Sequence, residues 1–300
     1  MLLLKDIINS FQMKKILFLF ILLFGTSITF AQKKSDKSQA EKKPFVLGEI
    51  RTIDSKILSE KRTLNIYLPE SYKETDTIKY PVIYLLDGAA DEDFIHVVGL
   101  VQYNTFPWIN RIPESIVVGI ANTNRKRDFT SPATIEILKK QMPNNGGSEK
   151  FISFLEKELQ PYIDNHFKTS NSKTIIGQSL GGLLATEILF TKPMLFNKYI
   201  IISPSLWWND GALLKTNPSL LEDTFSNQTD IYIGVGKEGL SPFFDNHVME
   251  VDANILCDKI KSGKSKSVKV HFDYLPEEDH ATVTHPSIFN AFRILYPKKN

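Results

Sequence analysis

The segment from 173 to 185, KTIIGQSLGGLLA, constrains the fold more than any other part of this 300-residue chain. A short apolar run leads into a G-x-S-x-G pattern, and apolar residues at helical spacing follow it. This order predicts a buried strand, a very tight turn and a helix, with the hydroxyl of Ser179 exposed at the strand's carboxyl end. We expect Gly177 and Gly181 to be bare because side chains there would collide with their neighbours. A plain strand-to-helix turn packed by its glycines is the alternative, and it needs no downstream histidine or acid.

Apolar runs alternate with helical patterns from about residue 45 to the end. The later runs are continuous, which is typical of strands covered on both faces, whereas the first two alternate as in an antiparallel edge. The fold class predicted is therefore α/β: a mostly parallel sheet with helices on both faces and an antiparallel N-terminal edge. The expected strands are 45–54, 62–68, 81–86, 115–120, 174–176, 199–202, 231–235 and 268–272.

The helical patterns lie between these runs, and a polar loop is expected over 122–128. Pro161 should kink or split the second helix, because proline lacks the N–H of a helix interior. A hydrophobic content of 42% suffices for one substantial core, and no repeat or second boundary is visible, so we expect one catalytic domain over 45–300. Helices are expected over 94–106, 148–167, after Ser179, over 246–260 and over 287–296.

The N-terminus has the pattern of an export signal. Lys14 and Lys15 precede an apolar run of about nine residues, and Ala31 ends a small-residue cleavage pattern. We predict a signal peptide over 1–31, a Lys-rich linker over 32–44, and a periplasmic or secreted protein with no stable membrane anchor after cleavage. Met13 is an alternative start. An uncleaved anchor is the other alternative, although the run is shorter than the roughly 20 apolar residues of a membrane span.

Composition excludes several classes of partner. The chain has 36 Lys+Arg against 34 Asp+Glu, and no basic patch with interleaved aromatics, so no nucleic acid is expected. Cys257 is the only cysteine, so no intrachain disulfide can form, and a buried structural thiol is expected. No cluster has metal-ligand spacing and no loop would cradle a phosphate, so we expect no metal and no cofactor.

A serine nucleophile needs a base, and in this chain order the histidine comes last. His280 follows the last predicted strand and is our candidate. His285 directly precedes Pro286 and is interpreted as a surface residue. His271 alternates within a strand and is expected in the core.

The acid should follow the strand 231–235. Glu238 is the first carboxylate there, with a surface glutamate on a turn as the alternative. Asp245 and Asp252 are the alternative candidates for the acid. The oxyanion donors should be the N–H of Leu180, at the N-terminus of the helix, and an N–H at Gly88 or Ala89, in the turn after the strand 81–86.

With these residues assembled, the chain resembles the esterase D-like family of α/β-hydrolases, on the branch of the trilactone siderophore esterases. The resemblance covers about residue 45 to the end. It implies Ser179 as nucleophile, His280 as base, Leu180 and the Gly88–Ala89 turn as oxyanion donors, Trp207 lining the acyl pocket and Arg127 near the site. The matching segments are 80–88 (YPVIYLLDG), 122–128 (NTNRKRD), 177–182 (GQSLGG), 203–208 (SPSLWW) and 279–280 (DH).

The chain departs from the family pattern at Gln178, where histidine or glutamate is common, and the acid is the uncertain match. Arg125 and Arg127 could bind an anionic substrate group or lie in a surface loop, with Arg127 paired to a carboxylate. Trp207 and Trp208 more often indicate packing than recognition, yet adjacent residues of an extended chain cannot both face inward.

Three functions remain open from the sequence. The first is an exported serine esterase for a small-molecule ester, with aromatic or catecholate esters ranked above acetyl esters. The second is an acyltransferase that uses the same acyl-enzyme. The third is a non-catalytic binding protein, against which the intact Ser179, His280 and Glu238 argue. The sequence names neither the acyl group, the alcohol nor the oligomeric state.

Overall fold

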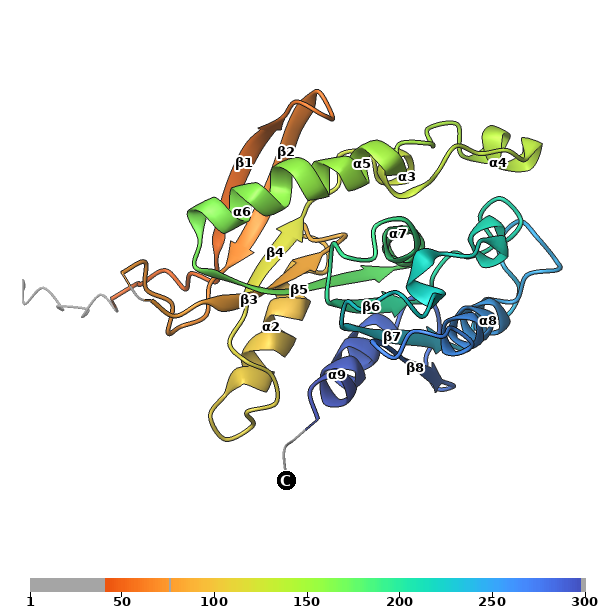
Figure 1. The fold of residues 1–300 in the computed structure, drawn as a ribbon. Coiled ribbons are helices and arrows are strands. Elements are labelled where there is room, and N and C mark those ends of the chain that lie inside the picture. The colour runs from red at the N-terminus through yellow and green to blue at the C-terminus, as the bar shows by residue number, and fades with distance from the viewer. Residues whose placement is uncertain (1–40, 76, 298–300) are drawn as a thin grey trace, which may run out of the picture. The chain divides into compact units, whose positions relative to one another are not determined.

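Eight strands form one mostly parallel sheet in the computed structural model, which describes residues 41–75 and 77–297 (Figure 1). The strand order is β1-β2-β4-β3-β5-β6-β7-β8. The described residues from Val46 onward form one compact unit. The predicted signal peptide and most of the predicted linker lie outside the described residues. The strands are β1 Glu49–Ser55, β2 Glu60–Tyr67, β3 Tyr80–Leu85, β4 Ile116–Ile120, β5 Thr169–Gln178, β6 Lys198–Ile202, β7 Thr229–Gly236 and β8 Val268–Leu275.

The N-terminal edge is antiparallel, as predicted. Strand β1 pairs antiparallel with β2, with Glu49 opposite Ile66, and β2 pairs antiparallel with β4, with Leu64 opposite Ile120. Every other pair in the sheet is parallel. The carboxyl ends of β3 to β8 therefore share one edge, which is where a parallel sheet of this kind places its site.

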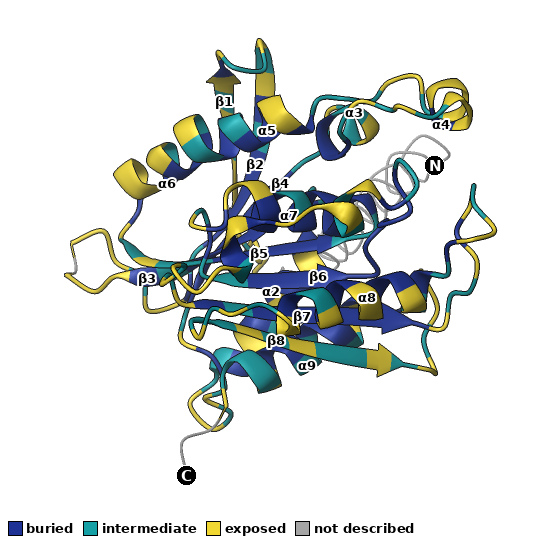
Figure 2. Ribbon diagram, turned by 45° about the vertical axis from the view of Figure 1, so that its right-hand side comes forward, coloured by how far each residue is buried: buried dark blue, intermediate teal, exposed yellow. Residues whose placement is uncertain are grey.

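Helices cover both faces of the sheet (Figure 1). Alternate residues of β3 show this: Ile83 and Leu85 pack with α2 and α9, whereas Val82 and Tyr84 pack on the opposite side. Strand β4 is buried along its whole length, and β3 and β6 are buried at all but one residue each (Figure 2). One face carries α2 (Phe94–Thr105) and α9 (Thr284–Leu295); the other carries α5 (Ser148–Phe154), η1 (Leu155–Leu159), α6 (Gln160–His166), α7 (Leu180–Thr191) and α8 (Met249–Lys261).

The predicted helix 148–167 is divided, as its proline indicates. A π-helical turn, Leu155–Leu159, separates α5 from α6 and directly precedes the helical turn that contains Pro161. Because proline has no N–H to donate, it is tolerated at the start of a helical segment, and the chain begins a new one there.

Two predictions of local structure differ from the structure. The expected loop 122–128 contains a short helix, α3 (Arg125–Phe129), capped by Asn124, whose side chain accepts the N–H of Arg127. His271 is not a core residue: it lies on β8, an edge strand, and is exposed, with its ring stacked on Tyr232. Strand β8 is the last strand of the sheet, where helices need not cover both faces. Alternation along β8 therefore does not imply that every second residue is buried.

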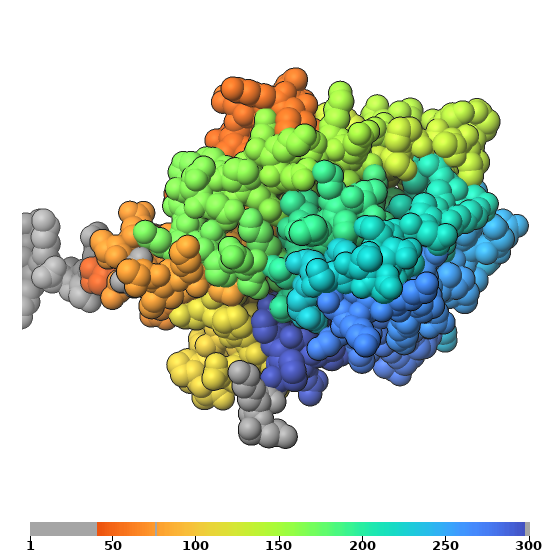
Figure 3. Space-filling model, viewed as in Figure 1, coloured from red at the N-terminus to blue at the C-terminus, as the bar shows by residue number. Residues whose placement is uncertain are grey.

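The segment before α4 (Glu136–Gln141) and the segment after β6 meet at the surface. The N–H of Thr134 donates to the side chain of Asn209, and the amide of Asn209 donates to the Pro132 carbonyl. Figure 3 shows these yellow-green and teal segments adjoining, next to α4. Within the described ranges, no helix is long and apolar enough to cross a membrane. Cys257 is buried and free, and burial raises the pKa of its thiol.

Candidate active site

Ser179 lies on a strained turn between β5 and α7. Its φ of 59° is in the left-handed region that non-glycine residues rarely adopt, and its N–H donates to the Ile202 carbonyl at 3.0 Å. Gly177 must be bare, because a Cβ there would lie 2.4 Å from the Gly181 carbonyl oxygen. Gly181 is less constrained than expected: its Cβ would meet Asp87 at 3.3 Å, a tight contact rather than a collision.

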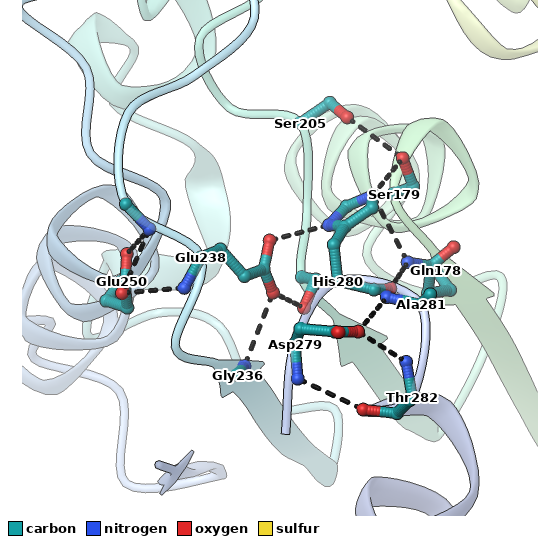
Figure 4. A network of polar contacts seen from close by, with 12 residues as sticks. Gln178, Ser179, Ser205, Gly236, Glu238, Glu250, Asp279, His280, Ala281 and Thr282 are labelled. Carbon is teal, nitrogen blue, oxygen red and sulfur yellow. Dashed lines mark hydrogen bonds and ion pairs between the residues drawn. The ribbon is translucent and has the colours of Figure 1, made fainter. Parts of the chain in front are cut away.

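The structure brings the three predicted catalytic side chains together (Figure 4). Nε2 of His280 lies 3.0 Å from Oγ of Ser179, and Nδ1 lies 2.5 Å from Oε2 of Glu238. With the proton on Nδ1, the imidazole donates to the carboxylate and accepts from the serine hydroxyl. The chain order is serine, acid, histidine, and each residue follows a different strand.

Glu238 has contacts that suit a buried acid. Its side chain is only 3% exposed. One carboxylate oxygen, Oε1, accepts the hydroxyl of Ser203 and the N–H of Gly236, while Oε2 faces His280. Of the two alternative acids, Asp245 is exposed and Asp252 contacts His247 instead. The geometry thus favours Glu238 over both.

Two loops approach closely to bring the acid and the base together. A Cβ on Gly236 would lie 2.6 Å from the Glu278 carbonyl oxygen, so only glycine fits there, and the N–H of Lys237 donates to that oxygen at 2.7 Å. The carboxylate of Asp279 accepts the N–H groups of Ala281 and Thr282, and these bonds lower the pKa of Asp279. His280 is thereby held on an ordered turn.

The oxyanion donors differ in part from the expectation. Leu180 is the first residue of α7, so its N–H has no partner within the helix, and no described residue accepts from it. The N–H of Gly88 instead donates to the Ile120 carbonyl, and the N–H of Ala89 to the carboxylate of Glu92. Gly88 is required for packing, because a Cβ there would lie 2.4 Å from Gly119. In this conformation only Leu180, of the three predicted donors, has its N–H available.

Of the two arginines, Arg125 and not Arg127 lies beside the nucleophile. Arg127 is bound through its guanidinium to Glu60 and Asp128, so the geometry favours the ion-pair alternative over substrate binding. Arg125 is the arginine beside the elbow: it forms a bidentate pair with Asp87 at 2.6 and 2.8 Å and donates to the Gln178 carbonyl at 3.2 Å. The helix α3 turns the two side chains in different directions, which spacing in a loop could not reveal.

Both tryptophans are buried, each 3% exposed. The expectation that they cannot both face inward holds for an extended chain, but this chain turns repeatedly, with positive φ at Asn209 and Asp210. Trp207 packs on Phe243 and Phe244, and Nε1 of Trp208 donates to the Ser131 carbonyl. Trp207 is two residues after Ser205, which lies beside the nucleophile, but its side chain has little exposed surface.

Sequence reasoning missed three polar contacts of the site. Oγ of Ser205 lies 3.4 Å from Oγ of Ser179, and the hydroxyl of Ser203 reaches Glu238. The amide of Gln178 donates to the His280 carbonyl at 2.9 Å. Both serines stand directly after β6, at the same sheet edge as the nucleophile, which is the signal that could have found them.

A family described as "Putative esterase" matches residues 55–269. The chain belongs to this family. It is a carboxylic ester hydrolase with the α/β-hydrolase fold, which confirms the resemblance found in the sequence and the predicted fold class.

Known proteins and solved structures align with most of the chain. The ferri-bacillibactin esterase BesA of Bacillus subtilis is 29% identical over 263 residues, covering 83% of this chain and 90% of BesA. The crystal structure of an IroE-like serine hydrolase from Shewanella oneidensis has a TM-score of 0.73 at 32% identity, covering 83% of this chain and 80% of that one. The BES protein of Bacillus cereus gives 0.70 at 27%, covering 86% and 100%.

Proposed function

We propose that this esterase works through an acyl-enzyme on Ser179, with His280 as base and Glu238 as acid. The observation that carries the proposal is the continuous Ser179–His280–Glu238 array, with the serine on a strained turn at the N-terminus of α7. Strain of this kind is retained where the surrounding structure enforces it, and it occurs at sites of chemistry.

The geometry supports a two-step reaction. Oγ of Ser179 attacks the ester carbonyl carbon while Nε2 of His280 takes the hydroxyl proton, and Glu238 stabilises the imidazolium. The N–H of Leu180 donates to the developing oxyanion. Collapse of the tetrahedral intermediate expels the alcohol, which leaves with the proton from His280. Water then attacks the carbonyl carbon of the acyl-enzyme and gives a proton to His280. His280 returns this proton to Oγ of Ser179 as the carboxylic acid product leaves.

The substrate we propose is a siderophore ester or an aromatic ester. BesA is named for a ferric siderophore and aligns over most of the chain. Phe243 and Phe244, which pack against Trp207, are half-buried aromatic side chains. The export pattern of the N-terminus further supports a place outside the cytoplasm, where imported or environmental esters are met.

The test is hydrolysis of a ferric catecholate trilactone, feruloyl esters and p-nitrophenyl acetate by wild type and Ser179→Ala. We expect the variant to lose roughly 10⁴-fold or more in kcat while retaining its melting temperature. A variant that keeps a tenth of wild-type turnover contradicts the nucleophile. When an alcohol is added, release of the free carboxylic acid indicates hydrolysis, whereas formation of a new ester indicates acyl transfer. Localisation of the tagged full chain tests export.

A further inference from the structure

Ser203 has a backbone conformation that favours glycine, although it is a buried serine. It directly follows β6, its φ is 43°, and the residue is fully buried. Its N–H donates to the Gly234 carbonyl at 2.8 Å, which continues the pairing of β6 with β7 by one residue. A glycine would adopt this φ without strain. A strained serine at such a place calls for a role of its hydroxyl.

That hydroxyl is directed at the acid. The Ser203 hydroxyl donates to Oε1 of Glu238, and the N–H of Gly236 reaches the same oxygen at 3.3 Å. The other oxygen, Oε2, is left for Nδ1 of His280. The two oxygens are thus divided, one held by the protein and one facing the base, which fixes the rotation of the carboxylate.

The backbone of the acid is held from the other side by Glu250, near the start of α8 (Figure 4). The Glu250 carboxylate accepts the N–H of Glu238 at 2.8 Å and the N–H of Gly239 at 2.9 Å. Gly239 has a φ of 76°, so the chain reverses there. Without this clamp, the acid would sit on an exposed turn of three residues between β7 and Leu240.

We propose that Ser203 and Glu250 are positioning residues of this esterase: the Ser203 hydroxyl orients the carboxylate of Glu238, and Glu250 fixes its backbone. The inference rests on the proposed role of Glu238 as the acid. Among the described residues, neither side chain hydrogen-bonds to Ser179 or His280, so both act through the Glu238–His280 pair.

A double-mutant cycle tests Ser203. We expect Ser203→Ala to lower kcat roughly ten- to a hundredfold with little change in KM. In a Glu238→Ala background the same substitution should have almost no further effect on kcat, because its partner is gone. The acidic limb of the pH profile of kcat/KM should move to lower pH, since the imidazolium loses stabilisation. Equal losses of kcat in both backgrounds overturn the proposal.

Ser203→Gly separates positioning from folding. It relieves the strain at positive φ, so the melting temperature should hold while kcat falls as in Ser203→Ala. The matched control is Ser115→Ala, a buried serine whose hydroxyl donates to the Pro113 carbonyl away from the site, and it should keep wild-type kcat. A Ser203→Gly variant with wild-type kcat refutes the role of the hydroxyl.

Glu250→Ala should lower kcat, whereas Glu250→Gln should recover most of it, because the amide oxygen can still accept both N–H groups. Glu149→Ala removes a first-turn glutamate from another helix, α5, and controls for the helix dipole. If Ser179→Ala is inactive but substitutions at Ser203 and Glu250 leave kcat unchanged, only the positioning inference fails. If Ser179→Ala is active, the proposed function itself fails.

Discussion

Oδ2 of Asp252 lies 2.8 Å from Nδ1 of His247, so this carboxylate contacts a histidine other than His280. The other ring nitrogen of His247 faces Asp210 at 3.1 Å. Asp252 is 4% exposed, and burial raises the pKa of its carboxyl although the hydrogen bond with His247 acts to lower it. Three carboxylate–imidazole contacts therefore occur among the described residues, of which only Glu238–His280 adjoins Ser179.

Replacing each acid in turn should identify the one that serves the base. We expect Glu238→Gln to lower kcat roughly 10²- to 10⁴-fold, and His280→Ala at least as much, because the histidine transfers the proton while the acid orients it. Asp252→Asn and Asp245→Asn should keep kcat within about threefold of wild type. Steady-state kinetics on one ester checks all four. An unaffected Glu238→Gln alongside a crippled Asp252→Asn would reverse the assignment.

The ion pair of Arg125 with Asp87 joins the turn after β3 to the carbonyl before the nucleophile. Arg125→Ala should lower kcat/KM roughly a hundredfold, because it leaves a half-buried carboxylate unpaired next to the elbow. Arg125→Lys should not restore activity, since an ammonium cannot replace the bidentate fork.

Arg127 provides the matched control for Arg125. It forms an equally extensive ion pair with Glu60, but away from the nucleophile. Arg127→Ala should lower the melting temperature and leave kcat/KM close to wild type. Equal activity losses at 125 and 127 would mean that both act through stability alone.

Glu60 gives a prediction about pH. Its hydrogen bond with Arg127 lowers the pKa of the carboxyl below its ordinary 4.5, against the opposing effect of burial and with help from Arg62. Since the unfolded chain then binds the proton more tightly, the stabilisation is present above about pH 4.5 and is lost as pH falls through the lower folded value. Urea midpoints of wild type and Glu60→Gln should differ at pH 7 and converge as the pH falls below the lowered pKa of Glu60. A difference in urea midpoint that does not change with pH would mean that Glu60 stabilises the protein through packing and not through its charge.

The strands and the nucleophile were predictable because their signals are local. A continuous apolar run indicates a strand buried on both faces, and a serine between glycines at its end predicts the elbow. His280 and Glu238 could be placed because each follows a strand at the same sheet edge.

What the sequence left open depends on where side chains point after the chain turns. Arg125 and Arg127 are separated by one residue, and only the helix α3 decides which faces the elbow. The occupied N–H groups of Gly88 and Ala89 reflect contacts with a neighbouring strand and with Glu92. Ser203 lies in the matched segment 203–208, but neither that segment nor its place after β6 shows what its hydroxyl contacts; its φ and its contact with Glu238 do.

The aromatic side chains around Trp207 bear on the choice of acyl group. Trp207 packs on Phe243, with ring centroids 5.4 Å apart, and both Phe243 and Phe244 are half-buried. Removing the indole should therefore loosen this aromatic cluster and weaken the binding of an aromatic acyl group more than that of an acetyl group. We expect Trp207→Ala to reduce the ratio of kcat/KM for feruloyl over acetyl esters about tenfold.

The ratio is the informative quantity, because Trp207→Ala removes a buried side chain and will also destabilise the protein, by about 3–5 kcal/mol. Loss of folded enzyme lowers both activities equally and cancels in the ratio. Trp207→Phe retains more of the packing and should show a smaller change of the same sign. Arg127→Ala should leave the ratio unchanged, because its guanidinium is bound to Glu60 and Asp128. A wild type that prefers acetyl esters, or a ratio that Trp207→Ala leaves unchanged, would refute the aromatic preference while leaving the esterase mechanism intact.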